Sequence, residues 1–320
     1  TGPCGDRSTA FYNPFRKKWV FSLRCKNKRA RDYVEHDDFL TGAQWTEDHV
    51  LPWADADRYD EPGAGAPQLY NLDAVAYESV MLGLFEIFKG PENYICEQNR
   101  EPKHTELMSA FSRDGFHWHR PDRTPFIPAD RRRGAWEYGY VQSTSSVCLV
   151  VGDELWFYYI GFAGDRWTEM TKPRQNNLGM YANGATGLAK LRRDGFASFE
   201  AGVHSGKLTT RHVVFQGTEL FVNVNTKGGQ FRAEVLDGET GQPLPGLAFT
   251  DCDGFTGNST RQRITWNGKN LASLAGKPVR FRFELTRGAI YAFWVSPDAS
   301  GKSMGYLAGG GPGYDRIIDD

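Results

Sequence analysis

Three acidic side chains stand just before or at the start of aromatic-rich segments and could carry acid–base chemistry: Asp6, Asp73 and Glu78. When two carboxyl groups flank one bond, one can protonate the leaving oxygen while the other attacks or activates water. Asp73 and Glu78 are five positions apart, so an ideal strand points them to opposite faces unless a bulge intervenes. The two residues are therefore alternatives as a general acid, and Asp6 would orient a substrate or stabilise charge.

Polar and aromatic residues near these acids are predicted to hold the substrate. They are Arg7, Trp136, Glu137, Tyr138 and Gln142. Aromatic faces such as those of Trp136, Tyr138 and Tyr140 are suited to stacking on flat apolar faces of a ligand, including sugar rings. The alternative for each acid, taken singly, is a structural role as a turn cap or as the partner of an arginine between neighbouring strands.

A sequence pattern repeats in the first two hundred residues and predicts how these side chains are positioned. Its units contain an aromatic strand followed by an Asp-containing turn that an aromatic residue closes. The strands are expected at 18–23, 80–88 and 155–160, and the turns at 36–39, 110–118 and 189–196. Self-similar β-rich units at a spacing of roughly 65 to 80 residues indicate propeller blades, here at about 6–55, 70–130 and 138–200.

Three blades leave a propeller ring open, because known rings need about four to eight. We therefore expect one or two blades to be missing from the N-terminal side or to be supplied by a partner chain. The innermost strand of each blade faces the central channel, so polar residues on those strands are the first candidates for a site.

The pattern of apolar and charged residues changes near residue 205. The segment 279–285 alternates strictly between apolar and charged side chains, as a strand with one buried face must. Several similar segments separated by Gly-rich turns indicate a β-sandwich. The predicted domains are thus propeller blades over 1–204 and a β-sandwich over 205–320, with the Gly-rich tail at 309–313 read as coil.

Composition excludes several classes of partner. The chain of 320 residues has a net charge of −1, which gives no overall attraction to nucleic acid or to a membrane surface. No run approaches the roughly 18 apolar residues that span a bilayer. The five cysteines are widely spaced and odd in number, so neither a disulfide framework nor a zinc site is expected, and no cofactor is implied. The chain shows no signal peptide, and a secreted or periplasmic location stays open.

Two segments carry a resemblance to a known group of proteins. The run 5–14 followed by Lys18-Trp19-Val20, and the turn 111–118, resemble five-bladed propeller glycoside hydrolases related to families 32 and 43. The resemblance implies that the chain holds the C-terminal part of a five-bladed propeller followed by a β-sandwich. It also implies an Asp that supports the transition state, approximated by Gly5-Asp6-Arg7, and an acid Glu, for which Glu78 could stand.

The resulting hypothesis is a glycoside hydrolase that acts on an oligosaccharide or polysaccharide by carboxylate chemistry at the propeller channel. Carbohydrate is the expected partner. The alternatives are a non-catalytic carbohydrate-binding propeller and an interaction scaffold without a small-molecule site.

Overall fold

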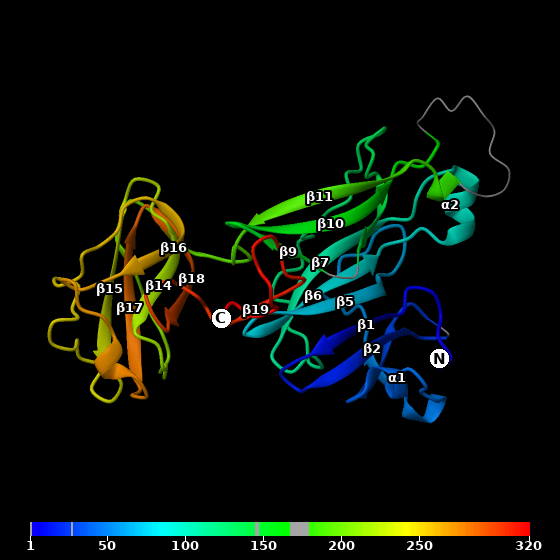
Figure 1. The fold of residues 1–320 in the computed structure, drawn as a ribbon. Helices are drawn as coiled ribbons and strands as arrows, with labels where there is room; N and C mark the ends of the chain where they lie inside the picture. Colours follow the sequence, from blue (N-terminus) through cyan, green and yellow to red (C-terminus); the bar gives the residue numbers. More distant parts are fainter. Residues whose placement is uncertain (1, 27, 145–146, 167–178) are drawn as a thin grey trace. The chain divides into compact units, whose positions relative to one another are not determined.

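The computed structural model describes residues 2–26, 28–144, 147–166 and 179–320, and its architecture is all-β with several sheets (Figure 1). The chain forms two compact units. The first comprises Thr1–Val150, Trp156–Lys190 and Tyr306–Ile317, and the second comprises Val151–Leu155, Leu191–Gly305 and Ile318–Asp320. Residues 145–146 and 167–178 of the predicted third blade lie outside the described residues.

Three antiparallel sheets make up most of the first unit, and each follows the order of the chain. The first is β1 (Thr9–Asn13), β2 (Lys18–Arg24), β3 (Arg31–His36) and β4 (Leu51–Ala54). The second is β5 (Gln68–Glu78), β6 (Val80–Phe88) and β7 (Thr105–Ser112), with β19 (Tyr306–Leu307) on the other side of β5. The third is β8 (Gly139–Ser143), β10 (Glu154–Phe162) and β11 (Gly184–Arg192), with β9 (Leu149–Val151) also paired to β10.

The predicted aromatic strands take equivalent places in these sheets. Trp19, Phe85 and Trp156 lie on β2, β6 and β10, each the strand that pairs with the first strand of its sheet. Figure 1 follows the repeat from blue β1 and β2 through cyan β5 and β6 to green β10 and β11. The repeat read from the sequence is therefore a repeat of antiparallel sheets.

The Asp-containing turn is built by side-chain hydrogen bonds to the backbone. Asp114 Oδ1 accepts from the backbone N–H groups of Phe116 (2.9 Å) and His117 (2.8 Å), and Ser112 Oγ accepts from that of Gly115 (2.8 Å). Such bonds hold a tight turn without regular pairing. The aromatic residue that closes the turn, Trp118, covers Gly83 of β6, where an added Cβ would lie only 2.6 Å from the indole.

Short helical turns complete the connections. They are α1 (Phe39–Gly42), η1 (Glu47–His49), α2 (Asn93–Asn99), η2 (Gly179–Tyr181) and η3 (Ala272–Leu274). The side chain of Asp38 caps α1 by accepting from the Thr41 N–H at 2.8 Å. No helix in the described ranges is long and apolar enough to cross a membrane.

The second unit is a sandwich of two antiparallel sheets. One has the order β12 (Phe199–Ala201), β18 (Gly288–Ser296), β14 (Glu219–Asn225) and β16 (Asn258–Ile264), and the other has β13 (Gly206–Thr209), β17 (Val279–Thr286) and β15 (Gln230–Asp237). Both sheets contribute to one apolar core. On β17, Phe281, Phe283 and Leu285 are buried in this core while the charged residues between them are not, as the alternation predicts.

The predicted domain ranges, 1–204 and 205–320, stay a prediction, and the two compact units divide the chain at other positions. Leu191 onward already belongs to the second unit, and the C-terminal stretch Tyr306–Ile317 returns to the first. Just before the Gly-rich stretch 309–313, which has no strand, β19 pairs with the edge of β5 at Tyr306↔Glu78 and Leu307↔Tyr77. A two-residue strand flanked by glycines has no periodicity to reveal it, and an unpaired strand edge readily takes up such a segment.

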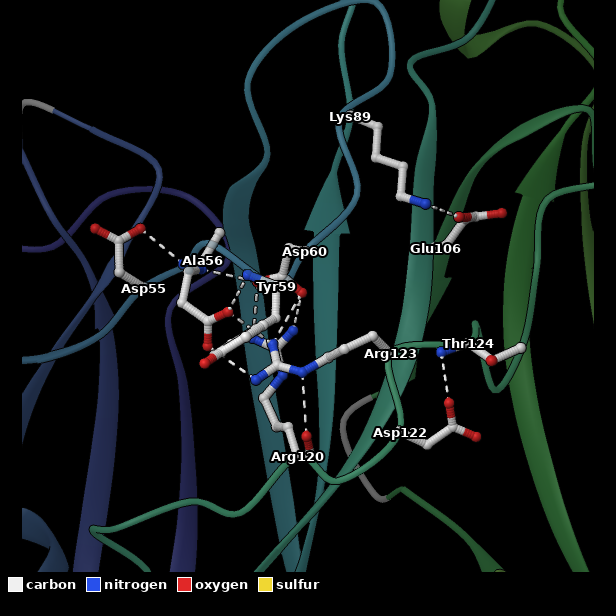
Figure 2. A network of polar contacts seen from close by, with 11 residues as sticks. Asp55, Ala56, Tyr59, Asp60, Lys89, Glu106, Arg120, Asp122, Arg123 and Thr124 are labelled. Atoms are coloured by element: carbon white, nitrogen blue, oxygen red, sulfur yellow. Dashed lines mark hydrogen bonds and ion pairs between the residues drawn. The ribbon is translucent and has the colours of Figure 1, made fainter.

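A buried ion-pair network fastens the loop before β5 to the segment after β7 (Figure 2). Asp60 accepts from both Arg120, through a bidentate contact, and Arg123 Nη1 at 3.2 Å, and Arg123 also pairs with Asp57. Nearby, Lys89 at the end of β6 pairs with Glu106 of β7 at 2.7 Å. The carboxylates of Asp60 and Glu106 are both buried, and each accepts several hydrogen bonds. We therefore assign these two acids a structural role.

We predict that Phe283→Ala destabilises the second unit by about 3–5 kcal/mol, because the ring is 1 % exposed and its loss leaves a cavity between the two sheets. Urea unfolding followed by tryptophan fluorescence measures this change. Arg280→Lys on the same strand is the matched control and should change the free energy of unfolding by less than about 0.5 kcal/mol. Equal losses in both variants would contradict the inward register of β17.

Candidate functional site

A β-bulge in β5 collects polar side chains on one face of the second sheet. The β5–β6 register shifts between Leu69 and Asn71, which makes Tyr70 the extra residue. Beyond the bulge the pairing is regular, with Asn71 opposite Glu86 of β6, so Asn71, Asp73 and Glu86 share a face. Bulges occur preferentially beside functional sites, where they re-aim side chains.

The first strands of the three sheets meet at this face. Thr9 of β1 donates to the Leu72 carbonyl of β5 at 3.4 Å, and Ser143 of β8 donates to Asp73 Oδ2 in a short hydrogen bond. Asp73 Oδ2 also accepts from Asn71 Nδ2 at 3.0 Å. Asp73 is thus joined to β8 by a direct side-chain contact.

Two arginines from the first sheet complete what we call the acid cluster, defined as Arg7, Arg31, Asn71, Asp73 and Glu86. Arg7, just before β1, donates Nη2 to Glu86 Oε2 at 2.9 Å. Arg31, at the start of β3, donates Nη1 to the Arg7 carbonyl at 2.8 Å. Arg31, Asn71, Asp73 and Glu86 are no more than 2 % exposed, whereas the side chain of Arg7 is 24 % exposed. Arg7 is therefore the member of the cluster that reaches solvent.

Burial dominates the electrostatics of the cluster. It raises the pKa of Glu86 to about 7, with Asp73 acting in the same direction and the two arginines opposing it. Burial also lowers the pKa of Arg31 to about 10. For Arg7, burial is outweighed by the carboxylates of Glu86 and Asp73, so its pKa lies above the ordinary value. Burial therefore controls the pKa of Glu86, which is fully buried, but not the pKa of Arg7, whose side chain keeps contact with water.

The cluster concentrates buried polar atoms that have no hydrogen-bond partner among the described residues. They are Arg7 Nε, Arg31 Nε, Asn71 Oδ1, Asp73 Oδ1 and Glu86 Oε1. Leaving one buried polar atom unpaired costs about 1–3 kcal/mol, so natural proteins do so rarely. Three free acceptors and two free donors around one pair of carboxyl groups match a ligand with several hydroxyl groups.

A second bulge brings tyrosines next to the cluster. The β8–β10 register shifts between Ile160 and Phe162, so β8 carries one extra residue in the stretch between Gly139 and Gln142. Within that stretch Tyr140 has a φ of 51°, a left-handed conformation that is unfavourable for a bulky residue. Its hydroxyl lies 2.9 Å from that of Tyr70. The two tyrosines thus face one another from bulged segments of different sheets.

The sequence candidates fall in different places. Asp73 lies in the acid cluster, and so does Arg7, which is predicted from the sequence to bind the substrate. Asp6 is 61 % exposed and pairs with Arg24, so it points away from Arg7's contacts. Glu78 ends β5 with a φ of 49°, and the regular pairing from Asn71 to Tyr77 keeps it at the other end of the strand from Asn71. The structure therefore does not bring Asp6, Asp73 and Glu78 together.

The remaining candidates lie on or near β8. Gln142 is buried next to Ser143, the partner of Asp73. Glu137 accepts a hydrogen bond from the Tyr159 hydroxyl, and the 38 % exposed ring of Trp136 lies 5.6 Å from that of Tyr159. Tyr138 is covered by Arg131, whose guanidinium lies 3.9 Å from the ring centre.

Sequence reasoning missed Glu86, Arg31, Asn71 and Ser143. A signal existed for Glu86, because it is the only charged residue within the otherwise apolar run of β6. A charged residue inside a fully buried strand must be paired or functional. Within the described ranges, no group of three or more His, Cys, Asp or Glu side chains is arranged to hold a metal ion.

Comparisons with known proteins give only distant similarity. No protein-family model matches the chain, and no curated protein matches its sequence. Among solved structures, a protein from Parabacteroides distasonis assigned as a glycoside hydrolase has 14% identity and a TM-score of 0.27, over 49% of this chain and 47% of that one.

Two further structures match over more of the chain. A family 43 arabinoxylan arabinofuranohydrolase from Bacillus subtilis, solved with cellotetraose, has 10% identity and a TM-score of 0.29 over 90% of this chain and 66% of that one. A fructofuranosidase variant from Schwanniomyces occidentalis, solved with fructosylnystose, has 7% identity and a TM-score of 0.28 over 89% and 68%. This chain spans about half the length of the first protein and about two thirds of the other two. TM-scores this low establish neither a shared fold nor a function.

We predict that the free energy of unfolding decreases as pH rises from about 4.5 to 7, and that Glu86→Gln removes this dependence. The folded-state pKa of Glu86, about 7, lies above the ordinary 4.5. The folded protein therefore holds this proton more tightly, and the stabilisation is complete below pH 4.5 and is lost as pH rises through 7.

Urea unfolding between pH 4.5 and 8 measures the effect. The difference between the wild type and Glu86→Gln should change by on the order of 3 kcal/mol across this range. Carbon NMR of the glutamate carboxyl groups reports the titration directly. Parallel stability curves for the two proteins would show that Glu86 titrates near its ordinary value.

Proposed function

We propose that the chain is part of a carbohydrate-active protein of the glycoside hydrolase type, with its site at the acid cluster. The observation that carries the proposal is the pair Asp73 and Glu86, buried on one face of adjacent strands, each with one carboxyl oxygen that no described residue satisfies. Structural acids elsewhere in the unit, such as Asp60, are fully engaged by arginines. An unsatisfied carboxyl pair is instead the donor and acceptor set that glycosidic cleavage needs.

The two acids have distinct environments and therefore distinct roles. Glu86, with its pKa raised by burial, holds a proton near neutral pH and serves as the general acid toward the leaving glycosidic oxygen. Asp73, held by Asn71 and Ser143, serves as the second carboxylate, which attacks the anomeric carbon or activates water. Cleavage breaks the bond from the anomeric carbon to the leaving oxygen, and water supplies the new hydroxyl group and proton.

We further infer that the three sheets of the first unit are propeller blades. Each is an antiparallel sheet whose strands follow one another along the chain, and the first strands of all three contribute to or adjoin the acid cluster. That convergence is the arrangement expected where innermost strands line a central channel. Carbohydrate is the proposed substrate class because a carboxyl pair suits glycosidic cleavage, and because partly exposed aromatic rings such as Trp136 of the same unit could stack on sugar rings.

One observation favours a second candidate, a saccharide-binding protein without catalysis. Glu86 is 0 % exposed, and Arg7 already occupies one of its carboxyl oxygens. In a saccharide-binding protein of this kind, Asp73 and Glu86 would hydrogen-bond the hydroxyl groups of the saccharide without cleaving it. Binding of oligosaccharides without any product would identify this function.

We predict that Asp73→Asn and Glu86→Gln each lower turnover by a factor of about 10² or more, the scale of lost acid–base catalysis. The assay uses aryl glycosides of arabinofuranose, xylose, glucose and galactose, together with sucrose, and proton NMR follows the anomer released. Asp37→Asn, an exposed aspartate paired with Lys18, is the matched control and should retain wild-type turnover.

Glu78→Gln tests which end of β5 holds the acids. A loss equal to that of Asp73→Asn would move the acid pair toward the β5–β6 turn. Wild-type protein that neither cleaves nor binds any member of the panel would reject the proposed function.

A further inference from the structure

Arg31 is a buried arginine that no carboxylate of the described residues binds directly. It is 1 % exposed, and the one hydrogen bond that its guanidinium makes to a described residue runs from Nη1 to the Arg7 carbonyl at 2.8 Å. Its Nε is buried without a partner among the same residues. Arg120, another buried arginine of this unit, is instead held by both carboxyl oxygens of Asp60. Because burying a charge is costly, packing alone does not account for Arg31.

The backbone at Arg7 is one that the contact with Arg31 can hold in place. Arg7 has a φ of 60°, in the left-handed region that residues other than glycine rarely adopt. It lies in a turn that Ser8 closes by donating its hydroxyl to the Gly5 carbonyl at 3.1 Å. Unfavourable backbone conformations persist only where neighbouring groups fix them. Arg31 fixes the peptide group between Arg7 and Ser8, because its guanidinium binds the carbonyl oxygen of that group.

The side chain of Arg7 carries this constraint to the second sheet. Arg7 Nη2 donates to Glu86 Oε2 at 2.9 Å, and the Glu86 side chain is fully buried. The contact occupies one carboxyl oxygen and leaves Oε1 without a partner among the described residues. A continuous series of contacts thus leads from Arg31 at the start of β3, through the backbone and side chain of Arg7, to Glu86 on β6.

We propose that Arg31 is a positioning residue, which acts through Arg7 to hold the Glu86 carboxyl group in one orientation and so keeps Oε1 available to a ligand. The inference rests on the proposed function, in which Glu86 is the general acid. A general acid must lie within hydrogen-bond reach of the oxygen that it protonates. A misplacement of about 1 Å can lower the rate of an enzyme about 10²-fold, so an acid without this support would be productive only part of the time.

Two ways in which Arg31 could act on Glu86 can be told apart without a substrate. Arg7 opposes the effect of burial on the pKa of Glu86 more strongly than Arg31 does. If Arg31 acted through its charge alone, removing it would change the pKa of Glu86 by the same small amount whether or not Arg7 was present. Because Arg31 acts through Arg7, its removal should weaken the contact between Arg7 and Glu86 and have most of its effect only when Arg7 is present.

The test is a double-mutant cycle on the full chain, with carbon NMR of the glutamate carboxyl groups as the readout. Arg7→Met should raise the pKa of Glu86 by about 1 pH unit or more, because the neighbouring cation is lost. Arg31→Met should raise it by at least half as much, and the double variant should titrate close to Arg7→Met. Additive changes in the double variant would overturn the proposal. Arg16→Met, which removes an exposed arginine paired with Glu35, is the matched control and should leave the pKa of Glu86 unchanged.

Arg31→Lys is the second variant, and it keeps the test decisive if Arg31→Met does not fold. Lysine retains a positive charge at this position, but its shorter side chain lacks the guanidinium fork that reaches the Arg7 carbonyl. The pKa of Glu86 should therefore rise in Arg31→Lys as well. An unchanged pKa in this variant would show that only the charge of Arg31 matters, and the positioning role would be wrong.

Turnover separates this proposal from the proposed function. With any glycoside of the panel that the wild type cleaves, Arg31→Met should lower kcat by about tenfold or more and change KM by less than about twofold, because Arg31 acts on the acid and not on the substrate. Unchanged kcat would overturn the positioning role and leave the proposed function in place. If the wild type neither cleaves nor binds any glycoside, the proposed function fails, whereas the NMR cycle still decides whether Arg31 fixes Glu86.

Discussion

The packing of three buried charged side chains, Arg31, Asp73 and Glu86, with the partly exposed Arg7 is the constraint on which the first unit depends. Arg7 and Glu86 form a direct ion pair, Arg31 is held by the Arg7 carbonyl, and Asp73 is bonded by Asn71 and Ser143. Removing one partner would leave an uncompensated buried charge, at a cost of about 3–5 kcal/mol. Stability alone does not explain the cluster, however, because apolar residues of similar volume would serve as well or better.

The contrast with the Asp60 network makes the same point. There Arg120 and Arg123 satisfy the carboxylate completely, and the network ties a loop to the segment after β7. In the acid cluster the charges are equally buried, yet five polar atoms have no partner among the described residues. The two networks thus differ in their carboxylates: Asp60 is fully bonded, whereas Asp73 and Glu86 each keep one oxygen without a partner among the described residues.

The sequence predicted those features that a local period reveals. Strict alternation gave the inward face of β17, and the Ser-Arg-Asp-Gly turn gave the connection after β7, because Asp114 and Ser112 form it with their own neighbours. The aromatic segments marked β2, β6 and β10 for the same reason. Asp73 could be found because an acid in the middle of β5 is conspicuous among mostly apolar neighbours.

The features that escaped prediction depend on pairing between strands. A bulge at Tyr70 restarts the alternation of β5, so no pattern in the sequence shows that Tyr70 and Asn71 depart from simple alternation. Glu86 becomes significant only when β6 is placed in register beside Asn71. The return of Tyr306 and Leu307 to the edge of β5 has the same origin, since two residues carry no period.

Both halves of the candidate site are built where regular pairing is interrupted. The bulge in β5 sets the carboxyl face, and the bulge in β8 places Tyr140, with its φ of 51°, against Tyr70 and Lys103. A regular strand presents one side chain in two to a given face, so it could not crowd so many polar groups into one region. The irregular backbone is stable only because neighbouring groups fix it, among them the Lys103 carbonyl that accepts from the Tyr140 N–H. The strained Tyr140 and the buried Lys103 therefore depend on each other, because the Lys103 carbonyl holds the Tyr140 backbone and the Tyr70 hydroxyl contacts both side chains.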